Sequence, residues 1–206
     1  MQWRKTNNNI EQIYNPSPIS PKGIPALKEK RFIAVGRLDA GKGYDYLIEA
    51  WSLVAKQHPD WRLDIFGQGD SYDKILKDIQ QRNLSSTVKL CGTTKNITDE
   101  YYNSSGFVMT SRYEGFPMAL IEAATCGLPL VAFDCKTGPK EIIYEGVNGF
   151  LIPMGDVKVL AEKICLLIDS QNKRIYMGRN AMELAKEYSI DNIMAHWIQL
   201  FEHLSH

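Results

Sequence analysis

The sequence lacks the features that mark a secreted, disulfide-rich or zinc-binding protein. Its four cysteines include no C-x-x-C pair, and its four histidines show no spacing suited to zinc. Most of the cysteines lie in apolar strand or helix patterns, so buried free thiols in a reducing cytosol are the simplest interpretation. A disulfide between Cys126 and Cys135 is the alternative. No metal or other cofactor is expected, because no D-x-D pair is present either.

The sequence also has no visible signal peptide and no apolar run long enough to span a membrane, because Glu122, Gly127 and Pro129 interrupt the longest one. We therefore expect a cytoplasmic protein, with the inner face of the membrane as the alternative location. Lys+Arg and Asp+Glu balance at 24 each, so no global field would attract nucleic acid or an anionic surface. The 206 residues, 44% of them hydrophobic, are ample for the core of one domain.

Short apolar runs alternate with amphipathic segments along the chain. Strands are expected over residues 31–35, 61–66, 87–90, 106–110, 128–133 and 150–152, with a further short strand over 10–14. Helices are expected from residue 42, over 71–82, 97–103 and 117–126, from Asp156, and over 172–187 and 191–204. This alternation predicts an α/β fold, a doubly wound, mostly parallel six-stranded sheet with helices on both faces and additional C-terminal helices.

The segment SRYEGFPMALIEAATCG, residues 111–127, places two glutamates around the start of a buried helix. Pro117 suits the first helical position and Gly127 the end of the helix. Glu114 then lies just before the helix. Glu122, the only charged residue between residues 115 and 133, lies on the side of the helix, about one and a half turns in. A buried carboxylate of this kind needs a partner.

Between the two glutamates lie the backbone N–H groups of Met118 and Ala119, which we expect to be unpaired. Those groups and the helix dipole favour an anion such as phosphate. Carboxylates accept hydrogen bonds from sugar hydroxyls. A ligand with phosphate at its middle and hydroxyls at both ends would match this arrangement, which indicates a nucleotide sugar.

A second candidate segment, residues 36–43, follows the first predicted strand and contains Arg37 and Lys42. Lys42 lies at a predicted helix start, where the dipole disfavours a cation. A bound anion would remove that conflict, and the arginine offers a planar fork to phosphate oxygens.

These two segments resemble a known family. Glu114-Gly-Phe-Pro-(x)4-Glu122 is similar to the E-x7-E motif of retaining GT-B glycosyltransferases of family 4 (glycosyl transferases group 1). Gly36-Arg37-Leu-(x)3-Lys42-Gly is similar to the family's phosphate-gripping loop, although Gly41 stands where many relatives have an acid. The resemblance covers roughly residues 10–200 and implies the C-terminal, donor-binding domain of such an enzyme.

The resemblance also implies a role for each matching residue. Glu114 would be the catalytic residue that holds sugar hydroxyls and orients the anomeric carbon, and Glu122 would accept the ribose hydroxyls. A nucleophilic Glu114 is the alternative, although the family is usually described as attacking on the leaving-group face without a covalent enzyme intermediate. The expected diphosphate contacts are Arg37, Lys42 and the backbone of Met118 and Ala119. Close backbone approach to the donor, or contact with its base, is expected at Gly36, Gly67, Thr93, Thr94, Gly115 and Phe116.

Two of these assignments have alternatives. Gly67-Gln-Gly69 equally suits a tight turn, and it is not a dinucleotide fingerprint because the third glycine is missing. Residues 134–143 resemble the "tGp-x-E-i-i" segment of family members that act on cell-surface polysaccharides, which favours a UDP-sugar over GDP-mannose. Glu141 in this segment is expected either to cap a helix near the site or to be an exposed helix carboxylate.

The resemblance further implies a domain organisation. Ile13-Tyr-Asn-Pro16 is similar to the strand and turn where family 4 enzymes enter their second domain. We therefore expect a tail and linker remnant over 1–18, a donor-binding domain over 19–206, and no N-terminal acceptor domain. The partners would be the nucleotide-sugar donor and that absent domain, which would also contact any peripheral or lipid-linked acceptor. An apolar stripe on the last helix, comprising Ile193, Trp197, Leu200 and Leu204, would either face the absent domain or cover the chain's own sheet.

Two other functions stay open at this point. One is a non-catalytic module that binds nucleotide sugars. The other is a GT-B enzyme such as a UDP-sugar 2-epimerase, which would depend on histidines and acids of the cleft. The four histidines, His58, His196, His203 and His206, are expected on helix ends or the tail, which argues against the epimerase.

Overall fold

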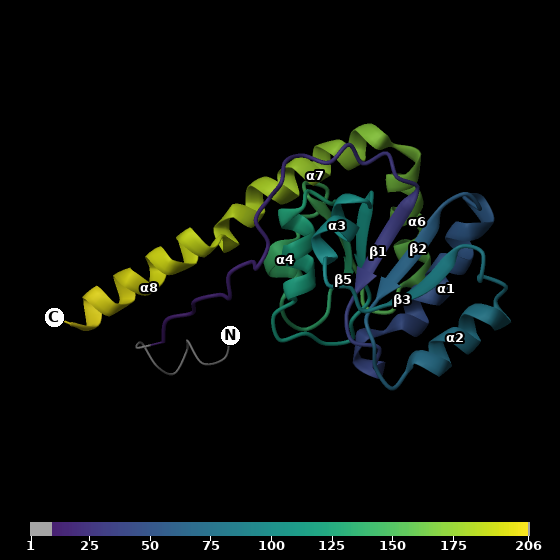
Figure 1. The fold of residues 1–206 in the computed structure, drawn as a ribbon, viewed down its shortest axis with the longest axis horizontal. Coiled ribbons are helices and arrows are strands. Elements are labelled where there is room, and N and C mark those ends of the chain that lie inside the picture. The colour runs from purple at the N-terminus through teal and green to yellow at the C-terminus, as the bar shows by residue number, and fades with distance from the viewer. Residues whose placement is uncertain (1–9, 206) are drawn as a thin grey trace.

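The computed structural model describes residues 10–205 and shows a six-stranded sheet between two layers of helices (Figure 1). The first nine residues of the predicted tail lie outside the described part. The strands are β1 Arg31–Val35, β2 Arg62–Phe66, β3 Val88–Gly92, β4 Gly106–Met109, β5 Leu130–Phe133 and β6 Gly149–Ile152. Their order is β3-β2-β1-β4-β5-β6, and every neighbouring pair is parallel. The predicted doubly wound fold is confirmed.

The helices cover both faces of the sheet. They are α1 Tyr44–Gln57, α2 Tyr72–Gln81, α3 Ile97–Tyr102, α4 Met118–Thr125, α5 Pro139–Ile142, α6 Val157–Asp169, α7 Gln171–Ala185 and α8 Ile190–Leu204, with short 3-10 helices at Ala40–Lys42 and Lys186–Tyr188. Helices α1, α2 and α6 pack in one apolar cluster, and α3, α4, α5 and α7 in another. Because both faces are covered, the central strands β4 and β5 are wholly buried and read as continuous apolar runs.

Local sequence signals explain where several elements begin and end. Asp156 caps α6 as predicted, since its carboxylate accepts a hydrogen bond of 3.0 Å from the N–H of Val159. Gly127, with a φ of +76°, follows the end of α4 in the left-handed conformation that glycine tolerates. The four cysteines are free thiols, so the alternative disulfide between Cys126 and Cys135 is not formed.

The strand predicted over residues 10–14 is wrong, because that segment has no regular structure. The ring of Tyr14 stacks on Phe116 with centroids 4.8 Å apart and meets Tyr188 edge-on at 5.6 Å. These contacts hold the segment beside α4 and the end of α7. It therefore does not reach β3 or β6, the edge strands where another strand could pair.

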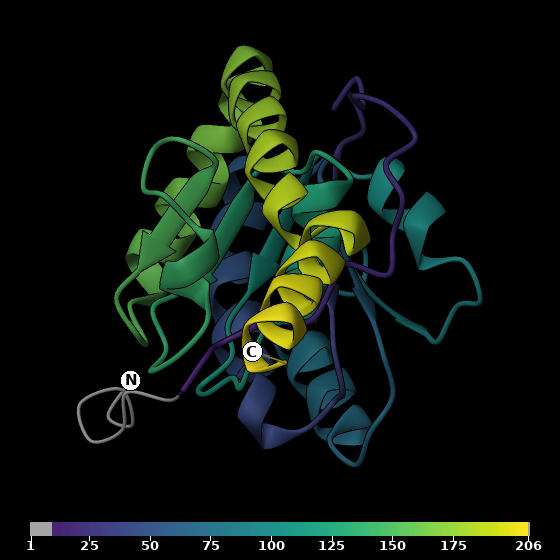
Figure 2. The same ribbon diagram turned by 90° about the vertical axis from the view of Figure 1, so that its left-hand side faces the viewer.

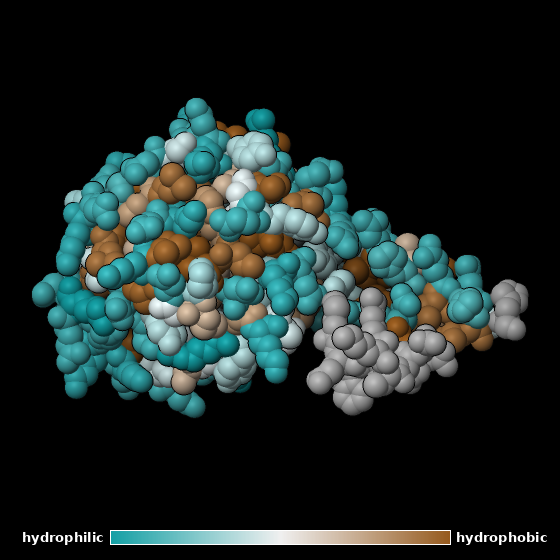
Figure 3. Space-filling view, turned by 180° about the vertical axis from the view of Figure 1, so that it is seen from behind, coloured by the Kyte–Doolittle hydropathy of each residue, from teal (hydrophilic) through white to brown (hydrophobic). Residues whose placement is uncertain are grey.

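Helix α8 extends away from the rest of the domain as an arm (Figure 1). In Figure 2, where the left-hand side of Figure 1 faces the viewer, α8 lies in front of the domain. Of its predicted apolar stripe only Ile193 is buried, while Trp197 is 40% and Leu204 70% exposed. Hydrophobic residues are visible along this arm in Figure 3. The stripe therefore does not cover the chain's own sheet. No helix within residues 10–205 combines the length and apolar character needed to cross a membrane.

Candidate functional site

The predicted site residues converge on the carboxyl ends of β1 and β4. These strands are neighbours, but the chain continues from β1 to β2 on one side and from β4 to β5 on the other. The connections after β1 and β4 therefore separate and leave a crevice, the place where open parallel sheets bind ligands. Arg37 and Lys42 follow β1, and Glu114 follows β4.

An ion pair joins the two loops across this crevice. Lys42 Nζ lies 2.6 Å from Glu114 Oε1, and the hydroxyl of Ser111 donates to the same oxygen at 2.6 Å. The side chain of Glu114 is 9% exposed and that of Lys42 is 28% exposed. A nearly buried carboxylate is thus neutralised and held by groups from both loops.

Asp39 organises the loop after β1. Its Oδ1 accepts hydrogen bonds from the N–H groups of Gly41 at 2.8 Å and Lys42 at 3.2 Å, and its Oδ2 lies 2.8 Å from Nε of Arg37. Burial tends to raise the pKa of Asp39, but the hydrogen bonds from Arg37 and Gly41 outweigh it and lower that pKa. Arg37 is 79% exposed, so its guanidinium remains accessible to a ligand.

Arg112 braces the same two loops. Its Nη1 donates to the carbonyl of Ala40 at 2.7 Å, and its guanidinium forms a two-nitrogen pair with Asp45 at 2.9 and 2.5 Å. Its backbone N–H donates to the carbonyl of Gly41 at 2.8 Å. Next to it, the Tyr113 hydroxyl lies 2.8 Å from the point where a Cβ on Gly41 would be. A Cβ at position 41 would therefore require the exposed side chain of Tyr113 to move.

The start of α4 differs from the prediction in two respects. Pro117 precedes the helix, which begins at Met118, because the proline has a non-helical ψ of 82°. The N–H of Met118 is not unpaired but donates to the carbonyl of Phe116 at 3.0 Å, which makes an inverse γ-turn centred on Pro117. Among the described residues no hydrogen-bond partner is found for the N–H of Ala119, which keeps it available to an anion.

Glu122 faces a cavity of about 230 Å³ beside the crevice. The hydroxyl of Tyr101 donates to Glu122 Oε2 at 2.9 Å. Burial raises the pKa of Glu122, and this hydrogen bond opposes the rise. The cavity is lined by Val35, Gly36, Phe66, Gly67, Gly92, Thr93, Thr94, Ile97 and Glu122. Five of the predicted residues, Gly36, Gly67, Thr93, Thr94 and Glu122, therefore share one pocket.

Of the predicted backbone positions, Gly67 lines this pocket, whereas Gly115 and Phe116 do not. A Cβ on Gly67 would lie 1.9 Å from the carbonyl oxygen of Gly36, so the close approach of the Gly36 backbone already requires a glycine here. Gly115 has open space around it and, with Phe116, lines a separate cavity of about 510 Å³ against residues 10–15. Within residues 10–205, no group of three or more His, Cys, Asp or Glu side chains is arranged to hold a metal.

The loop after β5 supports the one that contains Glu114. The Thr137 hydroxyl donates to the backbone carbonyl of Glu114. Glu141, in the short helix α5, does not cap a helix; its Oε2 accepts a hydrogen bond from the hydroxyl of Tyr14 at 2.7 Å. Residues 134–143 thus tie the segment before β1 to the rim of the crevice.

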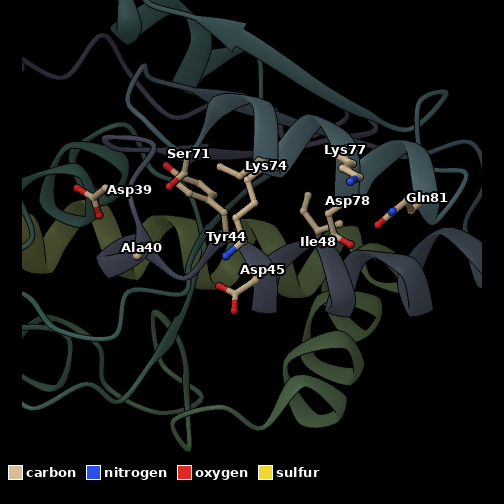
Figure 4. A pocket seen from close by; sticks show the side chains of 11 residues that line it. Asp39, Ala40, Tyr44, Asp45, Ile48, Ser71, Lys74, Lys77, Asp78 and Gln81 are labelled. Carbon is tan, nitrogen blue, oxygen red and sulfur yellow. The ribbon is translucent and has the colours of Figure 1, made fainter.

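A further cavity of about 380 Å³ lies between α1 and α2 (Figure 4). Its acids are already paired, Asp39 with Arg37, Asp45 with Arg112 and Asp78 with Arg82. None of the residues predicted to bind a ligand lines it. Tyr44 connects it to the crevice, since its hydroxyl donates to the carbonyl of Gly36 at 3.0 Å.

Sequence reasoning did not single out Asp39, Tyr101, Ser111 or Arg112. Asp39 and Ser111 stand inside the two motif segments, two and three residues from groups that they bind, so their local spacing offered a signal. Tyr101 lies 21 residues from Glu122 and carries no such signal, because its contact depends on how α3 packs beside α4.

Comparison with known proteins gives one family and a consistent set of relatives. Residues 18–184 match the family described as glycosyl transferases group 1. The amylovoran biosynthesis glycosyltransferase AmsD of Erwinia amylovora is 38% identical over 197 residues, which cover 92% of this chain and 55% of AmsD. The chain thus spans about half the length of that curated relative.

Two solved structures share the fold and contain UDP. A mutant of S. aureus TarM in complex with Fondaparinux, alpha-GlcNAc-glycerol and UDP superposes with a TM-score of 0.82 at 34% identity, covering 94% of this chain and 38% of TarM. The pneumococcal O-GlcNAc transferase GtfA in complex with UDP and GlcNAc gives a TM-score of 0.78 at 27% identity, covering 93% and 38%.

Proposed function

Because the chain belongs to the glycosyl transferases group 1 family, we propose that it is the donor-binding part of a retaining GT-B glycosyltransferase of family 4. It would transfer a sugar from a nucleotide diphosphate sugar in the synthesis of a surface polysaccharide or glycoconjugate. One observation supports this most directly. Cations for a diphosphate, the loop containing Glu114 and the pocket containing Glu122 all lie at the point where the strand order reverses.

In this proposal the donor lies across the crevice. Its nucleoside enters the cavity of about 230 Å³, where Glu122 accepts the ribose hydroxyls and the backbone at Thr93 and Thr94 meets the base. Arg37, Lys42 and the N–H of Ala119 bind the diphosphate. The sugar then lies beside Glu114, on the side of the cavity formed by Gly115 and Phe116.

The same residues would stabilise the developing charge during transfer. As the bond between sugar and diphosphate breaks, negative charge grows on the leaving group, where Arg37, Lys42 and the start of α4 supply positive charge. Glu114 Oε1 accepts hydrogen bonds from Lys42 and Ser111, and the Ser111 bond can remain when Lys42 turns to the diphosphate, which makes Glu114 a poor nucleophile. We therefore assign it to holding sugar hydroxyls, with the acceptor attacking on the leaving-group face and the configuration retained.

A UDP-sugar is the preferred donor, ahead of GDP-mannose. TarM and GtfA, which share 34% and 27% of aligned residues with this chain, were both solved with UDP. The relative from Erwinia amylovora is named for amylovoran biosynthesis, which agrees with a polysaccharide or glycoconjugate product. These observations support the assignment through similarity.

The acceptor would bind a second, N-terminal domain, and α8 offers a surface for that domain. Trp197, Phe201 and Leu204 are exposed on the arm, and a helix with an uncovered apolar face needs a partner. By this proposal residues 1–18 form the linker, and the chain alone would bind donor with little or no transfer. We place the whole protein in the cytoplasm, where a lipid-linked acceptor would bring it to the inner face of the membrane.

An epimerase has less support. The described histidines are His58 at the end of α1 and His196 and His203 on α8, and none lines the crevice or its cavities. His206 lies outside the described residues. A non-catalytic binding module would share the donor site and would differ only in lacking transfer when an acceptor domain is supplied.

Titration with UDP, GDP and ADP by calorimetry tests the proposed function. We expect UDP to bind best and both Arg37→Ala and Glu122→Ala to weaken it. Arg62→Ala is a matched control, because Arg62 begins β2 and therefore lies at the amino ends of the strands, away from the crevice at their carboxyl ends. Binding of UDP that neither site variant weakens would contradict the assignment of the site.

A further inference from the structure

We propose that Tyr101 is a positioning residue for Glu122, and that its hydroxyl fixes the carboxylate in the orientation that receives the ribose. The proposal rests on the proposed function, which assigns the ribose to Glu122. Tyr101 lies outside both motif segments. Its contact would explain how the Glu122 carboxylate, on the side of α4, is kept in one orientation.

The contact is specific and buried. Tyr101 Oη lies 2.9 Å from Glu122 Oε2, and the tyrosine is fully buried. Its ring meets Phe107 of β4 edge-on, with centroids 6.1 Å apart, so the hydroxyl has little freedom to move. Within the described part of the chain, Tyr101 is the only hydrogen-bond partner of the Glu122 side-chain carboxylate.

The geometry leaves part of the carboxylate for a ligand. A carboxylate has about four lone-pair positions. One is used by Tyr101, on Oε2, and Glu122 itself lines the cavity of about 230 Å³. The remaining positions suit two neighbouring hydroxyl groups, as a ribose provides.

The charges around Glu122 make this hydrogen bond important. The titratable groups that face it are Tyr101 from α3 and Cys126 directly after α4, and none of its partners among residues 10–205 is a cation. Burial raises the pKa of Glu122 and of Tyr101, so the phenol stays protonated and can donate. The Tyr101 hydrogen bond is then the contact that favours the ionised form of Glu122, which accepts ribose hydroxyls most strongly.

The variant Tyr101→Phe tests this directly, because it removes one oxygen and keeps the ring that packs on Phe107. Tyr102→Phe is the matched control. It is the same change at the next residue, where the hydroxyl accepts a hydrogen bond from the N–H of Lys22 instead. Thermal melting should show that both variants fold.

Two measurements separate positioning from general stability. The first compares UDP with 2′-deoxy-UDP by calorimetry. We expect the wild-type chain to prefer UDP by about tenfold, which is near the lower end of what a hydrogen bond to a charged group contributes. Tyr101→Phe should weaken UDP binding about three- to tenfold and reduce the preference, because its Glu122 is no longer fixed. Tyr102→Phe should change neither.

The second measurement follows the pH titration of the Glu122 side-chain carboxyl by carbon-13 NMR without nucleotide. Tyr101→Phe should raise its pKa further, so UDP affinity would be lost at a higher pH as the solution is acidified. An unchanged carboxyl titration and an unchanged preference for UDP would overturn the inference. A wild-type chain that binds no UDP would overturn the proposed function. The pH titration of the Glu122 carboxyl in the wild type and Tyr101→Phe would then decide by itself whether Tyr101 positions Glu122.

Discussion

The ion pair between Lys42 and Glu114 leads to an unusual prediction about ligand affinity. In the structure Lys42 Nζ lies 2.6 Å from Glu114 Oε1, so a diphosphate must compete with Glu114 for this cation. The variant Glu114→Gln removes the competing charge and keeps the size of the side chain. We therefore expect it to bind UDP more tightly than the wild type, although Glu114 is the proposed catalytic residue.

The size of the effect follows from the separation and exposure of the two groups. At 2.6 Å the gross attraction is about 1.6 kcal/mol in a dielectric of ~80 and about 6 kcal/mol in one of ~20. Desolvation and the 28% exposure of the Lys42 side chain offset most of it, which leaves a net value of roughly 1 kcal/mol. If this is returned to the ligand, UDP affinity should rise about fivefold.

Calorimetry with UDP on the wild type and Glu114→Gln provides the assay. Glu183→Gln is the matched control, because Glu183 near the end of α7 also forms a 2.6 Å ion pair, with Lys186 directly after α7, and both side chains are exposed. It should leave UDP affinity unchanged. An affinity in Glu114→Gln that is equal to or below that of the wild type would refute the reasoning, because Lys42 would then not exchange Glu114 for phosphate.

The same pair should respond asymmetrically in stability. Lys42→Met leaves a 9% exposed carboxylate with only the Ser111 hydroxyl, and we expect a loss of about 1–3 kcal/mol in the free energy of unfolding. Glu114→Gln leaves a more exposed cation and should cost about 1 kcal/mol or less. Urea unfolding at low salt measures both, and equal losses would contradict the difference in burial.

Two further predictions concern stability. The folded-state pKa of Glu122 is raised, so its ionised form costs stability as the pH rises from the unfolded pKa through the folded one. Glu122→Gln should therefore be more stable than the wild type at pH 7, with the gain vanishing below about pH 4, as urea unfolding at both pH values would show. Gly178→Ala should be strongly destabilising, because its Cβ would lie 2.2 Å from the backbone carbonyl oxygen of Gly127. Gly41→Ala should change the melting temperature little, because its Cβ would come closest to the exposed side chain of Tyr113, which can move. Similar melting temperatures for the two alanine variants would show that the backbone around Gly127 yields as easily as a surface ring.

Much of the fold and part of the site could be predicted from local patterns. The apolar run at residues 31–35 became β1, and Asp156 caps α6, because strand periodicity and caps depend on a few adjacent residues. The prediction failed where distant contacts decide. Residues 10–14 read as a strand, but Tyr14 is held by Phe116 and Tyr188, and the segment has no neighbouring edge with which to pair.

The sequence by itself determined which residues carry charge and hydroxyls, the order of the elements, and the two motif segments that indicate a diphosphate and a sugar. Only the tertiary structure decided which of them meet. Lys42 and Glu114 are 72 residues apart and come together because β1 and β4 pair as neighbours in the sheet. Tyr101 reaches Glu122 because α3 and α4 cover the same face. Local propensity depends on adjacent residues, whereas these contacts depend on strand order, which the whole chain sets through burial on both faces of the sheet.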